Sequence, residues 1–266
     1  MTACRALLPA GEDWTPVGGG ESGAGVFRSG DGSRYAKCVP GGREGELAGE
    51  RDRVAWLAGQ GVPGPRVLGW HVTAGAGACL VTSAVAGVPA DRLPAGRLWQ
   101  AWEAIAGAVR ALHDLPARAC PFERGLDVMA AEAADVVARG AVNPDFLPEE
   151  QRDVPPARLL ARLRPEFGRR RRQEAEQAVV CHGDLCLPNI IVDPRTLRVS
   201  GFVDLGRLGR ADPYADLALL LTNARETWTG QEQARRADEA FAARYGITLD
   251  PGRLRFYLHL DPLTWG

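Results

Sequence analysis

Two aspartates and an asparagine stand in an order that could support chemistry on a phosphate. Asp184 and Asn189 share a polar segment with D-x-x-x-x-N spacing between two apolar, β-prone stretches, and Asp204 ends the next such stretch. A carboxylate can take the proton of an attacking hydroxyl. A second carboxylate and an amide oxygen are ligands that Mg²⁺ prefers, and they can share the ion with nucleotide phosphates. This order therefore predicts phosphoryl transfer, with Asp184 as the base and with Asn189 and Asp204 as metal ligands.

Each of these residues is common when it is taken alone. An aspartate in a turn usually has a structural role, because its side chain accepts hydrogen bonds from nearby backbone groups. Phosphoryl transfer, however, has a loose transition state, so a protein catalyses it mainly by positioning the reactants and neutralising charge on the phosphates. The ordered set of a base, an amide and a second carboxylate meets those needs and favours the functional interpretation.

The segments that must position these groups differ between the two parts of the chain. From Trp14 to about Val85 short β-prone runs alternate with turns and one helix, whereas later stretches show helical periodicity. The pattern predicts an α+β fold with a small β-rich lobe over residues 1–85 and a larger, mainly helical lobe over residues 86–266. A glycine-rich segment, Gly18 to Gly25, predicts a flexible turn, but it lacks the G-x-x-x-x-G-K-[ST] order of a P-loop.

A lysine and a glutamate of the small lobe could form a buried ion pair. Lys37 lies in an alternating, strand-like run, and in the following helix Glu50 shares one face with Leu47, Val54 and Leu57. A carboxylate on an apolar stripe is costly to bury unless a cation meets it, which makes Lys37 the candidate partner. Alternatively, Glu50 reaches solvent or pairs with a nearby arginine.

Two features of the larger lobe favour structural roles. Apolar residues recur at helical spacing from Leu98 to Leu112 and predict an amphipathic helix that packs in the core. His113 follows at its end, where we expect a helix-terminal or surface residue, because a histidine cation suits the negative end of a helix dipole. The basic run Arg169–Arg172 is flanked by glutamates and predicts a solvated helix face.

Composition and charge disfavour several classes of protein. Apolar residues make up 45% and charged residues 24%, and 32 basic side chains nearly cancel 33 acidic ones, so no nucleic-acid or membrane-surface role is expected. Without a secretory or membrane-spanning apolar run, we expect a cytoplasmic protein. The six cysteines include no C-x-x-C pair, and we expect reduced thiols and no structural metal, although Cys181, His182, Asp184 and Cys186 lie close in sequence.

The motifs of the larger lobe resemble those of the aminoglycoside phosphotransferases, a family related to eukaryotic protein kinases. The resemblance is carried by His182-Gly183-Asp184-x-x-x-x-Asn189, Ser200–Arg207 and Arg210-Ala211-Asp212. It covers nearly the whole chain, because Lys37 and Glu50 stand where the family has its nucleotide-site lysine and glutamate. It implies a bilobal, protein-kinase-like fold that uses ATP and Mg²⁺. It also implies that His182 braces the catalytic loop and that Asp216 ties the following helix to this loop.

The same resemblance implies where the nucleotide binds. Ser22 and Gly23 would lie in a loop that covers the phosphates. The backbone at Ser83 and Val85 would meet the adenine ring at a hinge near residues 83–85.

Two segments resemble the branch of the family that phosphorylates the 3''-hydroxyl of streptomycin. They are the loop Cys186–Asn189 and the C-terminal stretch Leu258–Gly266. The related 3'-branch typically ends in an acidic pair before an aromatic residue, whereas here Asp261 is followed by Pro262. This departure favours streptomycin over kanamycin-like substrates.

A polycationic aminoglycoside is expected to meet acidic side chains, because carboxylates pair bidentately with guanidinium groups. The candidates are Asp145, Glu149, Glu150 and Asp261. Acidic loop residues are commonly solvated, so the alternative for the first three is a loop that binds no ligand.

Two other kinds of function are compatible with part of these motifs. The same fold could phosphorylate the 3'-hydroxyl of another aminoglycoside, or a small alcohol such as choline or homoserine. A non-catalytic nucleotide-binding module is a third hypothesis, but the joint presence of Lys37, Glu50, Asp184, Asn189 and Asp204 argues against it. For the enzyme we expect a monomer with a small-molecule substrate and with no nucleic-acid or membrane partner.

Overall fold

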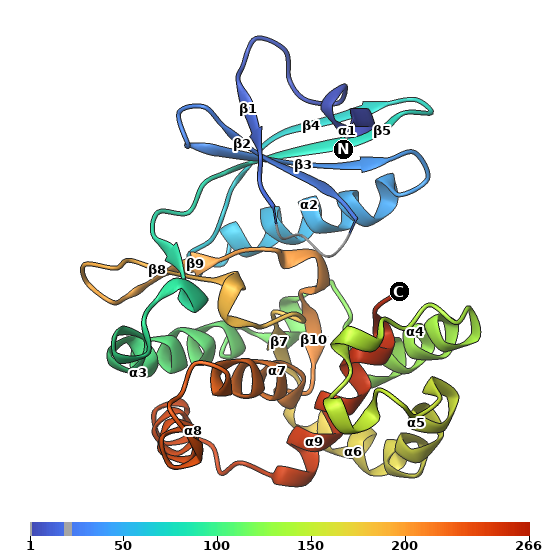
Figure 1. Cartoon of the computed structure of the whole chain (residues 1–266), viewed down its shortest axis with the longest axis vertical. Coiled ribbons are helices and arrows are strands. Elements are labelled where there is room, and N and C mark those ends of the chain that lie inside the picture. Colours follow the sequence, from blue (N-terminus) through green and yellow to red (C-terminus); the bar gives the residue numbers. More distant parts are fainter. Residues whose placement is uncertain (1, 19–22) are drawn as a thin grey trace. The chain divides into compact units, whose positions relative to one another are not determined.

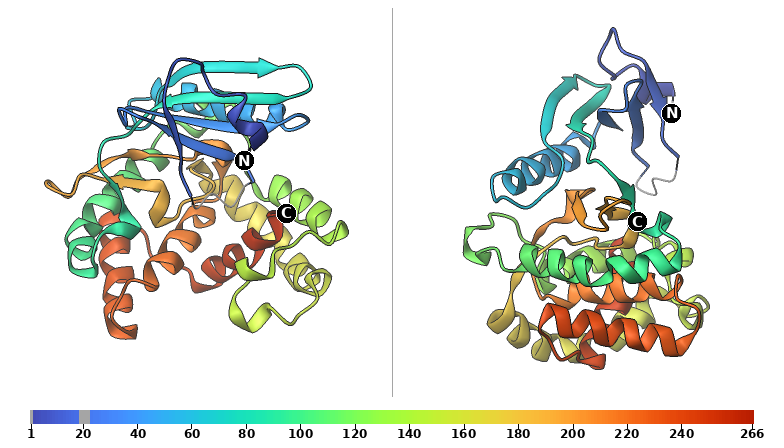
Figure 2. Two further views of the ribbon diagram at one scale, coloured as in Figure 1. Left: turned by 45° about the horizontal axis from the view of Figure 1, so that its top comes forward. Right: turned by 90° about the vertical axis from the view of Figure 1, so that its left-hand side faces the viewer.

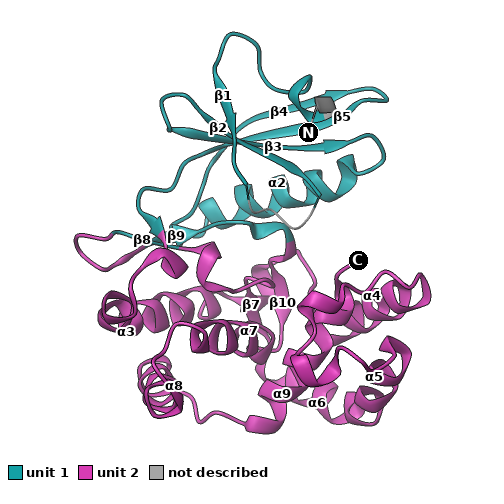
Figure 3. Cartoon of the chain, viewed as in Figure 1, with its two compact units in different colours: residues 1–88, 191–193, 200–206 teal, residues 89–190, 194–199, 207–266 magenta. Residues whose placement is uncertain are grey.

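The computed structural model of the chain describes residues 2–18 and 23–266 and divides into two compact units (Figure 3). One unit, here called the small unit, comprises residues 1–88, 191–193 and 200–206, and the large unit comprises the rest. The small unit is built on a β-sheet and the large unit mainly on helices (Figure 1), which confirms the predicted α+β class. The sequence-based division into residues 1–85 and 86–266 places residues 191–193 and 200–206 in the larger lobe, whereas here they belong to the small unit.

The small unit contains a five-stranded sheet in which all neighbouring strands are antiparallel. In spatial order the strands are β1 (Trp14–Pro16), β2 (Gly25–Ser29), β3 (Arg34–Pro40), β5 (Gly77–Ser83) and β4 (Val67–Thr73). A tight turn joins β2 to β3, and Gly32 permits it because its φ of 73° lies in the left-handed region. The turn fixes the register that places Lys37 opposite Val26 of β2, and on its other side Lys37 lies opposite Leu80 of β5.

The two faces of this sheet are covered by different helices. Helix α2 (Glu44–Ala58) lies along one face (Figure 2), where it packs against Val39, Ala78 and Leu80. The short helix α1 (Thr2–Arg5) packs on the opposite face, whose buried residues include Ala36 and Cys38 of β3. Because successive strand residues point to opposite faces, Lys37 lies on the α2 side.

The large unit is a helical assembly. Its helices are α3 (Ala95–His113), α4 (Leu126–Ala138), α5 (Pro156–Leu163), α6 (Phe167–Gln177), α7 (Tyr214–Arg225), α8 (Gln231–Tyr245) and α9 (Pro251–Leu260). The apolar stripe from Leu98 to Leu112 is buried as predicted, and Trp102 Nε1 donates to the carbonyl oxygen of Ala237 at 2.8 Å, which joins α3 to α8. Helix α7 is buried on most of its surface, so it forms a rigid support for the segments that contact it.

Short strands flank the polar segment singled out by sequence. They are β6 (Val88–Pro89), β7 (Val179–Cys181), β8 (Ile190–Val192), β9 (Val199–Phe202) and β10 (Gly209–Ala211). Strands β7 and β10 form an antiparallel pair, and β6, β8 and β9 form a three-stranded sheet in that order. The 3₁₀ helices are η1 (Ala90–Arg92), η2 (Ala117–Ala119), η3 (Pro144–Phe146), η4 (Glu149–Gln151), η5 (Arg164–Glu166), η6 (Leu187–Asn189), η7 (Leu205–Arg207) and η8 (Asp261–Thr264).

Among the described residues, no helix is both long enough and apolar enough to cross a membrane.

Candidate active site

Asp184 and Asn189 lie in the loop between β7 and β8, within the large unit, and contact each other. The side-chain nitrogen of Asn189 donates to the carbonyl oxygen of Asp184 at 2.8 Å and to its carboxylate Oδ2 at 3.1 Å. Asn189 is buried, and its backbone N–H donates to the carbonyl oxygen of Cys186 at 3.1 Å. Because the amide nitrogen is used in this way, the amide oxygen is the atom that can bind a metal.

Gly183 gives the loop a shape that other residues do not permit. Its φ is 84°, in the left-handed region. A Cβ atom at this position would lie 2.0 Å from the carbonyl oxygen of Arg207 and 2.6 Å from its carbonyl carbon. The glycine of the His-Gly-Asp motif is therefore required by close backbone packing within the large unit.

A buried aspartate on α7 holds the start of the loop. Asp216 is fully buried, and its carboxylate accepts the backbone N–H of His182 at 2.6 Å and that of Gly183 at 2.8 Å. His182 is also fully buried, and its Nδ1 accepts the N–H of Asp184 at 3.3 Å. The predicted roles of Asp216 in tying α7 to the loop and of His182 in bracing it are confirmed.

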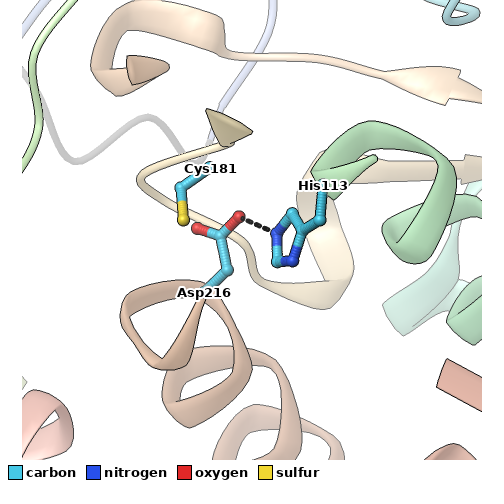
Figure 4. A group of neighbouring side chains, drawn as sticks. All are labelled: His113, Cys181 and Asp216. Atoms are coloured by element: carbon cyan, nitrogen blue, oxygen red, sulfur yellow. Dashed lines mark hydrogen bonds and ion pairs between the residues drawn. The ribbon is translucent and has the colours of Figure 1, made fainter. Parts of the chain in front are cut away.

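His113 belongs to the same network, which sequence reasoning missed. It ends α3 as expected, but it is buried instead of lying at the surface. Its Nε2 donates to Asp216 at 3.0 Å (Figure 4). Its Nδ1 lies 2.7 Å from the hydroxyl of Tyr245. The available signal was its position four residues after Val109, which continues the apolar stripe of α3.

The network keeps Asp216 ionised. Burial alone would raise the pKa of Asp216, but the hydrogen bond and charge of His113, with the backbone N–H groups of the loop, outweigh burial and lower it. Cys181 lies beside the pair (Figure 4), and burial raises the pKa of its thiol. Because both carboxylate oxygens of Asp216 already accept hydrogen bonds, we interpret these three side chains as structural and not as metal ligands.

In the small unit, Lys37 joins two acidic residues. Its Nζ lies 2.8 Å from Oε2 of Glu50 on α2 and 2.8 Å from Oδ1 of Asp204. The predicted pair of Lys37 and Glu50 is confirmed, and the alternative of a solvent-exposed Glu50 is not. Burial would lower the pKa of Lys37, but the two carboxylates outweigh it and raise the pKa, so the ammonium stays charged.

Asp204 has an unusual backbone conformation. Its φ is 59°, which an L-residue other than glycine seldom adopts, and such strain persists where the surrounding structure imposes it, often at functional sites. Its side chain keeps 47% exposure although it contacts Lys37. The carboxylate is therefore accessible to a cation, and an accessible carboxylate fits the donor chemistry of a Mg²⁺ ligand.

The predicted adenine hinge follows strand β5. The N–H of Ser83 donates to the carbonyl oxygen of Arg66 at 2.9 Å, and the N–H of Ala84 donates to that of Ser33 at 2.8 Å. Val85 makes no backbone hydrogen bond with any residue that the structure describes, so its N–H and carbonyl are available for a planar base.

The predicted phosphate loop is only partly described. Ser22 lies outside the described residues. Gly23 has a φ of 67°, which is consistent with a tight turn before β2.

The C-terminal segment buries the acidic residue predicted to bind substrate. Asp261 is 6% exposed, and its Oδ2 accepts the indole N–H of Trp265 at 3.1 Å. Two arginines approach its Oδ1, Arg124 at 3.6 Å and Arg207 at 3.9 Å. Burial raises the pKa of Asp261, and the two arginines oppose this shift. The carboxylate thus holds the C-terminus in place, and its contact with a substrate stays a prediction.

The other three candidate carboxylates are exposed. Asp145 lies on η3, and Glu149 and Glu150 lie on η4. Phe146 packs edge-on against Trp265 with ring centroids 6.3 Å apart, so this segment lies beside the C-terminal segment. Exposed carboxylates are available to a cationic ligand, but nothing in these contacts shows that they bind one.

Taken separately, the units carry complementary chemical groups. The large unit holds a carboxylate, Asp184, whose geometry is set by Asn189 and by the network of Asp216. The small unit holds a charged lysine with its glutamate and a strained, accessible aspartate. The fold and these groups define a phosphotransferase.

Comparison with known proteins agrees with this class. The profile of the phosphotransferase enzyme family (APH) matches residues 13–257, and the chain belongs to this family. The resemblance seen in the motifs is thus confirmed, together with the kinase-like fold.

Three relatives are especially informative. The chain is 67% identical to streptomycin 3''-kinase of Streptomyces griseus, over 98% of this chain and 95% of that protein. It is 42% identical to aminoglycoside 3'-phosphotransferase of Streptomyces fradiae, over 94% of each. The solved structure of aminoglycoside phosphotransferase APH(3'')-Id from Streptomyces rimosus, in complex with ADP and streptomycin, has a TM-score of 0.94 and 64% identity and covers 100% of this chain and 98% of that one.

Proposed function

We propose that this protein transfers the γ-phosphate of ATP to the 3''-hydroxyl of streptomycin and thereby confers resistance to this antibiotic. The observation that carries the proposal is the 67% identity with streptomycin 3''-kinase over nearly the full length of both chains. The identity to a 3'-phosphotransferase is much lower, at 42%. The similar structure that contains ADP and streptomycin supports the same pair of substrates.

In this proposal Asp184 accepts the proton of the acceptor hydroxyl. Its carboxylate is held by the amide nitrogen of Asn189 at 3.1 Å, and its backbone N–H is fixed by His182. A positioned base typically accelerates a reaction by about 10²–10⁴-fold, because the proton leaves as the new bond forms. The buried network of Asp216 keeps this loop from relaxing.

The remaining groups bind the nucleotide. Lys37, charged and fixed by Glu50, would contact the phosphates, and the backbone at Ser83 and Val85 would meet the adenine. The amide oxygen of Asn189 and the carboxylate of Asp204 would hold Mg²⁺. When bound, this ion neutralises charge on the phosphates. Both donors are oxygen atoms, as a hard cation requires.

The acceptor pocket of this proposal is acidic. Streptomycin carries two guanidinium groups, and Asp145, Glu149 and Glu150 are exposed carboxylates beside the C-terminal segment. Asp261 would contribute by fixing Trp265 and, through it, Phe146. We also propose that the protein acts as a cytoplasmic monomer.

The proposal is tested with purified protein, Mg-ATP and separate acceptors. We expect one added phosphate on streptomycin, located at the 3''-hydroxyl by mass spectrometry and NMR, and poor modification of kanamycin and neomycin. Choline and homoserine test the alternative of a small-alcohol kinase. Efficient phosphorylation of kanamycin with streptomycin left untouched would refute the substrate while leaving the phosphotransferase class intact.

A further inference from the structure

Three buried cysteines lie together in the small unit, on the face of the sheet opposite to the one that carries Lys37 and Glu50. Cys38 on β3 and Cys79 on β5 are directly opposite each other in the antiparallel ladder, and both are 0% exposed. We call them the strand thiol pair. Cys4 on α1 is 8% exposed, and its Sγ donates to the carbonyl oxygen of Cys38 at 3.7 Å. The remaining cysteines, Cys120, Cys181 and Cys186, belong to the large unit.

The hydrogen bonds of the ladder show how close the strand thiol pair must be. Opposite residues in an antiparallel ladder alternate between hydrogen-bonded and non-hydrogen-bonded pairs. At one end Gly41 donates to the carbonyl oxygen of Ala76 at 3.1 Å, and at the other end Ala84 donates to that of Ser33 at 2.8 Å. From either end, every second pair along the ladder is hydrogen-bonded, which includes Lys37 with Leu80 and Val39 with Ala78 but not the strand thiol pair between them. It therefore occupies a non-hydrogen-bonded position.

This position suits a covalent bond between the two sulfurs. Opposite Cα atoms in a non-hydrogen-bonded pair are about 4.5 Å apart, and their side chains approach more closely than in the other kind of pair. Disulfides span Cα separations of about 4.4–6.8 Å. The strands can thus be linked without moving the backbone far.

The environment also favours reaction between these two thiols. The hydrogen bond with Cys79, together with burial, raises the pKa of Cys38, while the same hydrogen bond lowers the pKa of Cys79. The thiolate, and not the thiol, is the nucleophile, so the sulfur of the pair that loses its proton is the one that reacts first. The pair is covered by Cys4 of α1 together with Leu7, Trp14 and Phe27, and a small peroxide reaches it when this cover opens locally, which needs less free energy than global unfolding.

We propose that the strand thiol pair is an oxidative modification site, in which a peroxide converts Cys38 and Cys79 to a disulfide that links β3 to β5. The thiolate of one cysteine attacks one oxygen of the peroxide, the O–O bond breaks, and hydroxide leaves to give a sulfenic acid. The other cysteine then attacks this sulfur, the S–S bond forms, and the oxygen leaves as water with the thiol proton. The two thiols lose two electrons, and hydrogen peroxide is reduced to two waters.

The bond would change stability more than catalysis. The sulfurs lie on the α1 side of the sheet, whereas Lys37 lies on the α2 side with Glu50. The oxidised protein should therefore still use ATP. Its unfolding midpoint in urea should rise, because a link between distant positions of the chain restricts the unfolded state.

The test is peptide mapping of the full-length protein after a short pulse of hydrogen peroxide. We expect a disulfide-linked peptide containing Cys38 and Cys79, reversal by dithiothreitol, and a higher urea midpoint in the oxidised protein. The variant Cys79→Ser should lose both the link and the rise in midpoint. The variant Cys120→Ser, which removes a buried cysteine of the large unit, should keep both. Circular dichroism before oxidation checks that each variant is folded.

Mapping of the wild-type protein decides the proposal even if a variant fails to fold. A link from Cys4 to either strand cysteine would overturn the assigned pairing. Oxidation confined to the partly exposed Cys186, with Cys38 and Cys79 still alkylated as free thiols, would overturn the site itself. Sulfinic acid at Cys79 without any disulfide would show that the two sulfurs do not meet, and would overturn it as well.

Discussion

Replacing Gly183 with alanine tests whether the shape of the catalytic loop depends on the absence of one side chain. The new Cβ would lie 2.0 Å from the carbonyl oxygen of Arg207, and Cβ contacts below 3.0 Å essentially do not occur in real proteins. The opposing atoms are the carbonyl group and the Cβ of Arg207, none of which moves with a side-chain rotamer, so no change of rotamer relieves the clash. The loop and the segment at Arg207 must separate by about 1 Å, the difference between these two distances.

The size of the effect follows from that displacement. A left-handed φ of 84° costs an alanine about 1–2 kcal/mol. Forcing backbone apart in a packed region adds about 1–3 kcal/mol, so the total loss of stability should be about 2–5 kcal/mol. The substitution should also reduce kcat strongly. Asp184 is the next residue, and a misplacement of about 1 Å can reduce a rate by about 10²-fold.

Gly140 offers a matched control within the large unit. Its φ is 64°, and a Cβ there would meet no atom within 4 Å, so Gly140→Ala carries the backbone strain without the clash. We expect Gly140→Ala to lose about 1–2 kcal/mol and to keep its kcat. Urea unfolding and steady-state phosphorylation of streptomycin measure both quantities. If Gly183→Ala matched Gly140→Ala in stability and in kcat, the packing argument for the loop would be wrong.

The remaining predictions concern single side chains. Asp184→Asn should lower phosphorylation by about 10²–10⁴-fold while nucleotide affinity, measured by calorimetry, is preserved; near-normal turnover would dismiss it as the base. Lys37→Ala should raise the KM for ATP much more than the KM for the acceptor, and equal changes would contradict its assigned role. His113→Gln, whose amide nitrogen can replace Nε2, should keep more of the kcat than His113→Asn, which can replace only Nδ1. The reverse order would refute the role of the hydrogen bond from Nε2 to Asp216. The lowered pKa of Asp216 contributes stability above the ordinary carboxyl pKa of about 4, and this contribution is lost as the pH falls through the lowered pKa. The difference in urea stability between wild type and Asp216→Asn should therefore shrink as the pH falls below about 4.

The parts of the fold and site that sequence predicted are those encoded locally. The apolar stripe of α3 repeats within one helix, so its burial could be read from spacing. The pair of Lys37 and Glu50 was predictable for a related reason. A carboxylate on an apolar helix face needs a cation, and the preceding strand supplied one.

The parts that sequence did not predict depend on contacts between distant positions. His113 and Asp216 are 103 positions apart, and no local pattern indicates that a helix-terminal histidine meets a carboxylate of another helix. For Asp261 the sequence predicts a carboxylate that meets a cationic substrate, and it does not indicate that the side chain is buried. The arginines beside it, Arg124 and Arg207, come from segments that only the folded chain brings near.

The small unit combines segments that are far apart in the sequence, so it cannot be completed until late in synthesis of the chain. Lys37 and Asp204 lie in the same unit but 167 positions apart, so at roughly 5–20 residues per second Asp204 is synthesised on the order of ten seconds or more after Lys37. Once residue 83 has been added, the nascent chain has all five strands of the first sheet and α2, yet it still lacks residues 200–206, which complete the unit. The part that is synthesised first therefore finishes folding only after most of the large unit has been made, and a chain truncated before residue 200 cannot complete either unit.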